Sequence, residues 1–133
     1  MNIRAIPALA VLSLAAVNGS APAGAQIENA NLLEKRCAAG VAASCANLAI
    51  LFKNGRGAAR DQARALTLFL KACEKGVDFA CGNVGEMTYL GHGIKANAKH
   101  GEAIVKGACR RGDAWSCETA RRYGFKSGKK QPA

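Results

Sequence analysis

The sequence has few aromatic residues and few acidic ones. One Trp, two Tyr and four Phe are spread over 133 residues, and much of the 50% hydrophobic content is alanine. A chain of this length is the size of a single compact domain. Side chains this small leave little bulk for a core. This argues against a large enzyme with a deep pocket and favours close packing of small residues or crosslinks.

The sequence also lacks an apolar run long enough to cross a membrane. The apolar stretch from Ala5 to Val17 has thirteen residues and is interrupted by Pro7, whereas a spanning helix needs about 20. A charged start at Arg4 and the small-residue motif Ala23-Gly24-Ala25 flank this stretch. We therefore expect residues 1–25 to be a signal peptide cleaved after Ala25, and no membrane span after cleavage. The protein is expected to be periplasmic or secreted.

Basic residues outnumber acidic residues by about two to one. Arg4 is the only charged residue of the expected signal peptide, so the mature chain keeps 18 Lys+Arg against 9 Asp+Glu. Basic proteins often bind nucleic acid, but an exported chain seldom meets it. We therefore expect the binding partner to be an acidic protein, peptide or other envelope component, and we expect no binding to nucleic acid.

The six cysteines reveal an internal repeat. They stand at 37, 45, 73, 81, 109 and 117, which makes three pairs with a spacing of eight, repeated every 36 residues. Gly40, Gly76 and Gly112 lie inside the pairs with the same period, and Gly-x-Gly loops begin at Gly55 and Gly91. Periods of 20–50 residues indicate stacked supersecondary units that bury their apolar faces against one another.

Helical spacing surrounds each central glycine. Before Gly76, the residues Ala65, Leu68, Phe69, Ala72 and Cys73 follow the i, i+3, i+4, i+7, i+8 pattern. A similar stripe follows the glycine, and no segment alternates with period two. Each unit is thus predicted to be two helices joined by a left-handed glycine turn. The predicted fold is an all-α solenoid of three helix-turn-helix repeats over about 26–60, 61–96 and 97–125, followed by a basic tail, 126–133.

The cysteines of a small exported domain most often form disulfides. Six cysteines allow fifteen pairings, of which the repeat favours the local set Cys37–Cys45, Cys73–Cys81 and Cys109–Cys117. In one unbroken helix such partners would lie about 12 Å apart, so the glycine turn is what permits each bond. Zinc ligation is the weaker alternative because zinc pairs have shorter spacing and the two histidines do not repeat with the cysteines. Redox catalysis is also weaker because no Cys-x-x-Cys motif occurs.

The paired cysteines, the A-C-x-x-G turns at Ala72 to Gly76 and Ala108 to Gly112, and the Gly-x-Gly loops together resemble a known family. They are similar to the Sel-one-like repeats of the Helicobacter cysteine-rich protein type, a branch of the tetratricopeptide superfamily. The resemblance implies a right-handed α-solenoid with one disulfide per hairpin, exported from the cytoplasm. The chain departs from the pattern where Asn97 stands at the position that Asp61 occupies one repeat earlier.

The resemblance implies a binding scaffold that receives a peptide or protein on the concave face formed by the first helix of each hairpin. Basic and polar residues predicted on those helices are the candidate contacts, and their shared positive charge favours an acidic ligand. We expect a monomer that needs no cofactor or metal and has no catalytic residues. The candidate binding residues are Arg64, Lys71, Lys99, His100 and Lys106.

The alternative is enzymatic, because relatives of this type are commonly described as β-lactamases or penicillin-binding proteins. A serine β-lactamase needs Ser-x-x-Lys with Ser-Asp-Asn and Lys-Thr-Gly elements. Only Ser127-Gly128-Lys129-Lys130 matches the first, in the expected tail, and the other two do not occur. Ser44 and Ser116 precede the second cysteine of their pairs, but no repeated histidine accompanies them. Phe79 and Trp115 occupy equivalent positions and are interpreted as packing residues of the hairpins.

Overall fold

The computed structural model describes residues 23–126, and side chains from Asn29 onward. Within this part the chain forms helices and no strand. The helices are α1 (Ala23–Ala38), α2 (Ala42–Asn54), α3 (Gln62–Glu74), α4 (Asp78–Leu90), α5 (Ala98–Arg110) and α6 (Ala114–Arg122). None of these helices is long and apolar enough to span a bilayer.

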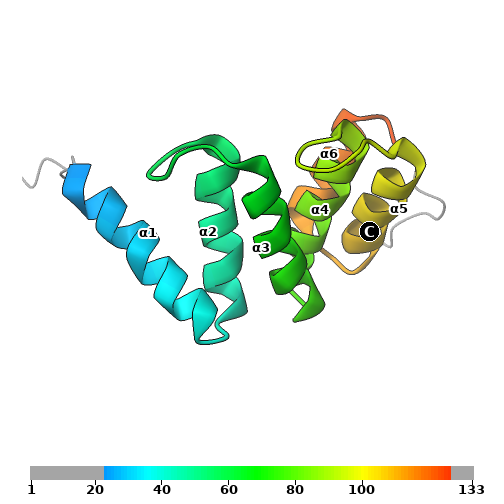
Figure 1. The fold of residues 1–133 in the computed structure, drawn as a ribbon. Coiled ribbons are helices and arrows are strands. Elements are labelled where there is room, and N and C mark those ends of the chain that lie inside the picture. The colour runs from blue at the N-terminus through cyan, green and yellow to red at the C-terminus, as the bar shows by residue number, and fades with distance from the viewer. Residues whose placement is uncertain (1–22, 127–133) are drawn as a thin grey trace, which may run out of the picture.

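The helices form three hairpins, α1 with α2, α3 with α4 and α5 with α6, which follow one another along an elongated array (Figure 1). Each hairpin also packs on the next one through α2 against α3 and α4 against α5. This arrangement confirms the predicted all-α solenoid of disulfide-stapled helix-turn-helix repeats. Most of the predicted signal peptide and tail lie outside the described residues. The predicted cleavage point after Ala25 falls inside the first turn of α1.

A left-handed glycine joins the two helices of each hairpin. Gly40, Gly76 and Gly112 have φ angles of 95°, 89° and 104°, a region that other residues rarely adopt. In the central hairpin the amide of Val77 donates to the carbonyl of Ala72, and that of Gly76 donates to Cys73. These bonds satisfy the last carbonyl groups of α3 and reverse the chain.

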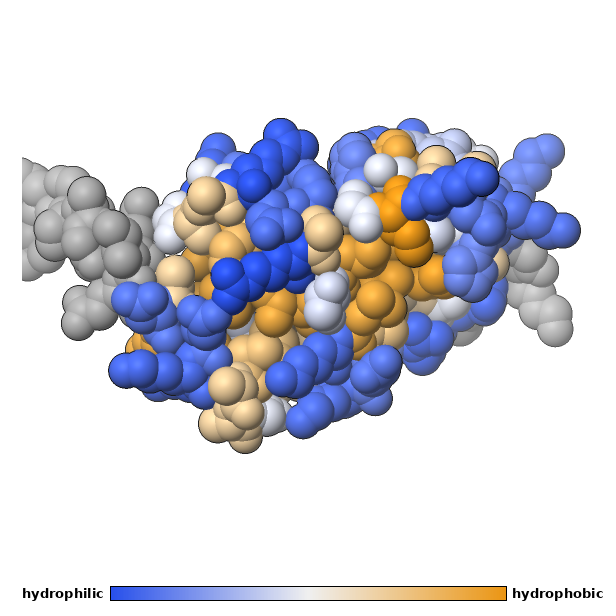
Figure 2. All heavy atoms as spheres, in the orientation of Figure 1, coloured by the Kyte–Doolittle hydropathy of each residue, from blue (hydrophilic) through white to orange (hydrophobic). Residues whose placement is uncertain are grey.

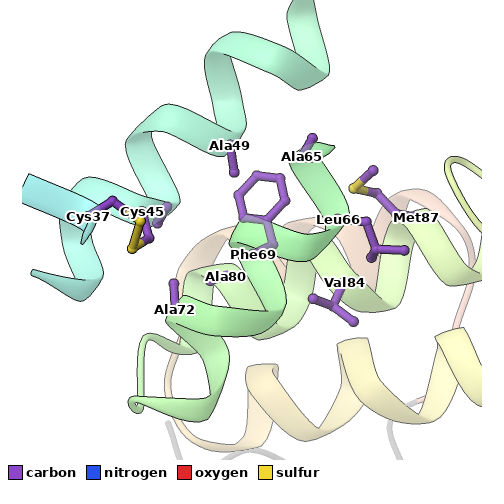
Figure 3. Close-up of a cluster of buried hydrophobic side chains, with 11 residues drawn as sticks. Cys37, Cys45, Ala49, Ala65, Leu66, Phe69, Ala72, Ala80, Val84 and Met87 are labelled. Carbon is purple, nitrogen blue, oxygen red and sulfur yellow. A yellow bond between two sulfur atoms is a disulfide. The ribbon is translucent and has the colours of Figure 1, made fainter. Parts of the chain in front are cut away.

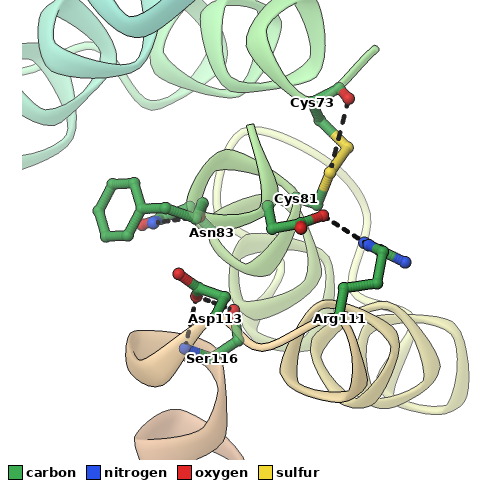
Figure 4. The surroundings of a disulfide bond; sticks show 8 residues. Cys73, Cys81, Asn83, Arg111, Asp113 and Ser116 are labelled. Atoms are coloured by element: carbon green, nitrogen blue, oxygen red, sulfur yellow. Dashed lines mark hydrogen bonds and ion pairs between the residues drawn. A yellow bond between two sulfur atoms is a disulfide. The ribbon is translucent and has the colours of Figure 1, made fainter. Parts of the chain in front are cut away.

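A disulfide closes each of these turns. The bonds join Cys37 to Cys45, Cys73 to Cys81 and Cys109 to Cys117, with Cα–Cα distances of 4.6, 4.7 and 4.5 Å. Figure 4 shows the central bond, where the carbonyl of Cys73 lies beside the sulfur of Cys81. Among the described residues no cysteine is free. The chain-entropy model assigns about 2.5 kcal/mol to each such nine-residue loop.

In the second and third hairpins, a basic residue at the end of the first helix reaches back to the preceding hairpin. The ammonium of Lys75 donates to the carbonyl of Gly40 at 3.2 Å. Its equivalent one repeat later, Arg111, donates to the carboxylate of Asp78 (Figure 4). Equivalent residues thus link successive hairpins, one through a backbone carbonyl and the other through a carboxylate.

The core is built largely of small side chains around one ring. Phe69 is fully buried among Ala49, Ala65, Ala72 and Ala80 (Figure 3). Leu66, Val84 and Met87 extend this cluster between α3 and α4. Because alanine side chains are short, neighbouring helices approach closely and the ring fills the remaining space.

Glycine replaces alanine where α4 and α5 approach each other closely. A Cβ atom on Gly101 would lie 2.4 Å from the amide nitrogen of Tyr89 and 2.5 Å from the carbonyl oxygen of Gly85. The equivalent pair between α2 and α3 is Ala49 and Ala65, both fully buried. The close approach predicted from the small residues of the second helices therefore occurs between α4 and α5.

Three helices begin with a side-chain cap. Asp61, Asn97 and Asp113 accept a hydrogen bond from the backbone amides of Arg64, His100 and Ser116, respectively. Asparagine and aspartate cap helices about equally well. The departure at Asn97 therefore leaves the fold unchanged. At the far end Arg121 is exposed, as expected for a terminal unit that faces water.

Two glycines of α5 give a matched test of this packing. Gly101→Ala should destabilise the protein by about 2 kcal/mol or more, because the added methyl meets backbone atoms that cannot rotate away. Gly107→Ala should stabilise it by about 0.5–1 kcal/mol, since the nearest atom is the flexible guanidinium of Arg111 at 3.5 Å. Urea unfolding of the oxidised protein measures both changes. Equal effects of the two substitutions would contradict the close approach.

Candidate functional site

A cavity of about 370 Å³ opens where the second helices of the three hairpins meet. We call it the second-helix pocket. Residues from α2, α4 and α6 line it, so all three repeats contribute to one site. The lining residues are Ile50, Lys53, Asn54, Phe79, Asn83, Glu86, Trp115 and Arg122.

The repeat builds this pocket from equivalent positions. Ile50, Glu86 and Arg122 are separated by 36 residues each, and Phe79 and Trp115 by the same interval. One position of the second helix is therefore apolar in the first repeat, acidic in the second and basic in the third. This variation concentrates different chemistry at one place on a regular scaffold.

A buried ion pair forms the polar centre of the pocket. The ammonium of Lys53 lies 2.7 Å from a carboxylate oxygen of Glu86 and donates to the amide oxygen of Asn83 at 2.8 Å. The other end of the Asn83 amide donates to the carbonyl of Phe79. The Glu86 side chain is 7% exposed and that of Lys53 is 19% exposed. A charge so far from water requires a close partner.

An aromatic wall lies beside this ion pair. The rings of Phe79 and Trp115 meet edge to face with centroids 5.3 Å apart, and Phe79 continues to Phe69 in the core. The ammonium of Lys53 lies 5.3 Å from the centre of the Trp115 ring, within the range of a cation–π contact. The two aromatic residues therefore pack successive hairpins together, as expected, and also line the pocket.

The second carboxylate oxygen of Glu86 faces the end of α6. The hydroxyl of Tyr123 donates to it at 3.2 Å, and a guanidinium nitrogen of Arg122 lies 4.0 Å away. Burial raises the pKa of Tyr123, and the negative charge and hydrogen bond of Glu86 raise it further. Lys53 and Tyr123 thus donate hydrogen bonds to this buried carboxylate, and the guanidinium of Arg122 lies near it.

The predicted first-helix residues do not line the second-helix pocket. Arg64 forms an ion pair with Glu34 and lies over the ring of Phe52, 4.3 Å from its centre. Lys71 donates to the carbonyl of Cys37 at 3.4 Å. Arg64 and Lys71 therefore join α3 to the preceding hairpin.

The other predicted contacts lie on α5. Lys99 and His100 are exposed, while Lys106 forms an ion pair with Glu102 one turn away on the same helix. Sequence reasoning missed Lys53, Glu86 and Arg122. The available signal was the 36-residue spacing of positions 50, 86 and 122, which joins three chemically different residues.

Other candidates contribute less. A smaller cavity of about 220 Å³ lies beside the Gly55-Arg56-Gly57 loop and is lined by Asn29, Leu51, Arg56 and Gly57. Over residues 23–126, His, Cys, Asp and Glu form no group that could hold a metal ion. The Ser127-Gly128-Lys129-Lys130 motif lies outside the described residues.

The surface of the array is amphipathic. Figure 2 shows apolar atoms gathered in the middle of one face and framed by hydrophilic side chains. Several large apolar side chains are 40–47% exposed in the described chain. They are Leu32, Val41, Leu70, Leu90 and Ile94.

Lys53→Met should destabilise the protein by about 3 kcal/mol, because the buried charge of Glu86 would lose its nearest counter-charge. The double variant Lys53→Met with Glu86→Met should recover most of that loss, since two apolar side chains need no counter-charge. Unfolding in urea compares the variants in one cycle with Glu86→Met alone. Additive losses would show that the two side chains do not interact.

Glu86→Gln should lower the pKa of Tyr123, because it removes a negative charge beside the phenol. The chain has two tyrosines, so absorbance at alkaline pH follows Tyr123 and Tyr89 together, and Tyr89→Phe isolates the first. The pKa of Tyr123 is higher in the folded than in the unfolded protein. The neutral phenol therefore stabilises the fold below about pH 10, and this stabilisation is lost as the pH rises through the folded-state pKa. An unchanged titration in Glu86→Gln would contradict the contact.

Comparison with known proteins identifies solved structures of the same architecture. No protein-family model matches the chain, and no curated protein matches it. Helicobacter pylori cysteine rich protein B is 27% identical, with a TM-score of 0.60 and 68% of each chain covered. A protective antigen of uropathogenic Escherichia coli that displays an SLR fold is 22% identical over 74% of this chain, with a TM-score of 0.66.

A third neighbour is a Sel1 repeat protein from Oxalobacter formigenes. It is 19% identical over 68% of this chain, with a TM-score of 0.62. The chain spans 21% of the Escherichia coli antigen and 26% of the Oxalobacter protein. All three neighbours share the fold of the hairpin array described above.

Proposed function

We propose that this chain, which has the Sel1-like repeat fold seen in Helicobacter cysteine rich protein B, is a scaffold that binds a peptide or protein partner. The observation that carries the proposal is the second-helix pocket, to which every repeat contributes at equivalent positions. A stacked array of hairpins offers an extended surface on a rigid frame, which suits a partner longer than one side chain.

The amphipathic surface supports a macromolecular partner over a small metabolite. Exposed apolar side chains beside charged ones are typical of protein interaction sites. The net charge of +10 over the full chain favours an acidic partner by steering it toward the surface. The first-helix residues Arg64, Lys71, Lys99, His100 and Lys106 remain candidate contacts for such a partner.

An exported location fits the chemistry of the chain. Three disulfides persist in oxidising compartments such as the periplasm or the extracellular space. The apolar N-terminal segment with its small-residue motif favours the same location.

The enzymatic alternative has less support. Ser116 is fully buried and its hydroxyl donates to the carboxylate of Asp113, which caps α6 (Figure 4). Ser44 is buried as well. A nucleophile needs a base and access to substrate, and neither serine has access. A scaffold accounts for the repeat, the pocket and the charge together.

Peptide display on the oxidised protein tests the scaffold. We expect enrichment of acidic peptides that bind saturably to the folded protein and not to the reduced, unfolded protein. A chromogenic β-lactam should give no turnover with the same sample. Saturable hydrolysis that disappears in Ser127→Ala, with no peptide enriched, would overturn the proposal in favour of the enzyme.

A further inference from the structure

We infer that the second-helix pocket binds a carboxylate group of an acidic peptide through Arg122 and Lys53, with an apolar neighbour of that group against Trp115 and Phe79. This inference rests on the proposed scaffold function and assigns its site and ligand chemistry. It places the carboxylate of the ligand on the second helices, and the first-helix residues remain candidate contacts for the rest of the partner.

The charges in the pocket do not balance. Lys53 and Arg122 bring two positive charges and Glu86 brings one negative charge. Glu86 already receives Lys53 on one oxygen and the hydroxyl of Tyr123 on the other. Lys53 therefore compensates the charge of Glu86 before Arg122 is counted. The charge of Arg122, whose guanidinium lies 4.0 Å from Glu86, is the excess positive charge at the cavity.

Arg122 has the geometry to bind an incoming carboxylate. Its side chain is 54% exposed, and its distance of 4.0 Å to Glu86 is too long for a hydrogen bond. One guanidinium nitrogen makes a long contact of 3.4 Å with the hydroxyl of Thr119. A guanidinium carries five N–H donors in a fork that matches a carboxylate, so most of them are available for a ligand.

Lys53 can supply a further donor from deeper in the pocket. An ammonium has three N–H donors, and Lys53 uses two of them on Glu86 and Asn83. Those two acceptors hold the ammonium in place in the absence of ligand. A positioned cation loses little side-chain entropy when the ligand binds, which favours affinity.

The aromatic wall selects what stands next to the carboxylate. Phe79 and Trp115 are both partly exposed and line the same cavity as Arg122. The exposed parts of the two rings offer an apolar surface for a side chain such as leucine. A volume of about 370 Å³ accommodates a carboxylate and one neighbouring side chain, near the lower end of the usual range for ligand pockets.

Trp115 is the only tryptophan of the chain, so its fluorescence reports directly on this pocket. The first probe is the pentapeptide Gly-Leu-Glu-Leu-Gly with both ends blocked, and its matched control has Gln in place of Glu. A third peptide keeps the Gln but has a free carboxyl terminus. Binding of the first indicates an acidic side chain as the source of the carboxylate, and binding of the third indicates a peptide terminus.

We expect a saturable change in fluorescence with a carboxylate peptide and none with the blocked Gln peptide at the same millimolar concentrations. Arg122→Gln should weaken binding about tenfold or more, because a charge-assisted hydrogen bond is lost. Arg121→Gln is the matched control, since its exposed side chain pairs with Glu118 and does not line the pocket. It should leave binding unchanged.

Several results would overturn the inference. They are equal binding of the Glu and blocked Gln peptides, no binding of either carboxylate peptide, and equal loss in Arg121→Gln and Arg122→Gln. A peptide selected by display that loses affinity in Arg64→Gln and keeps it in Arg122→Gln would also overturn it. That last result would leave the scaffold function standing with its site on the first helices.

Discussion

Each hairpin of this protein depends on the disulfide that closes its glycine turn. The core contains one large ring, Phe69, among alanines, so apolar burial alone gives a chain of this size little excess over its conformational entropy. A bond between cysteines eight residues apart reduces the freedom of the unfolded turn. It also fixes the angle at which the two helices leave that turn, and every later contact between hairpins depends on that angle.

With the turns fixed, small residues determine how hairpins stack. Glycine brings α4 and α5 so close that a Cβ on Gly101 would meet backbone atoms of α4. Buried alanines, Ala49 and Ala65, take the equivalent positions between α2 and α3. A larger side chain at Gly101 would displace α5, and with it α6 and the far wall of the pocket. Stability and pocket geometry therefore depend on the same interhelical junctions.

In the pocket, equivalent positions of the repeats keep the same place in the fold but carry residues of different chemistry. Equivalent positions on the three second helices carry Ile50, Glu86 and Arg122. A second pair of equivalent positions carries Phe79 and Trp115. A buried carboxylate is costly unless it is paired, and Lys53 supplies the pair from the preceding hairpin. The ion pair thus links the first two repeats and leaves the charge of Arg122 directed at the cavity.

The sequence by itself determined the repeat, its 36-residue period, the helical hairpins and the local cysteine pairs. These features are local, since a glycine turn and a short cystine loop depend on residues close together in the chain. It also placed Asn97 and Asp61 at equivalent positions, which the structure shows to be helix caps. The expected binding residues, from Arg64 to Lys106, followed from family resemblance and charge, without knowledge of which side chains would meet.

Only the tertiary structure decided where side chains from different repeats converge. Lys53 and Glu86 are 33 residues apart in sequence, and their contact depends on how one hairpin is rotated against the next. Likewise, Arg64 is engaged by Glu34 and Phe52 of the first hairpin, which its helical spacing could not reveal. Periodicity specifies the elements and their order, whereas stacking angles between hairpins come from the summed packing of many small side chains.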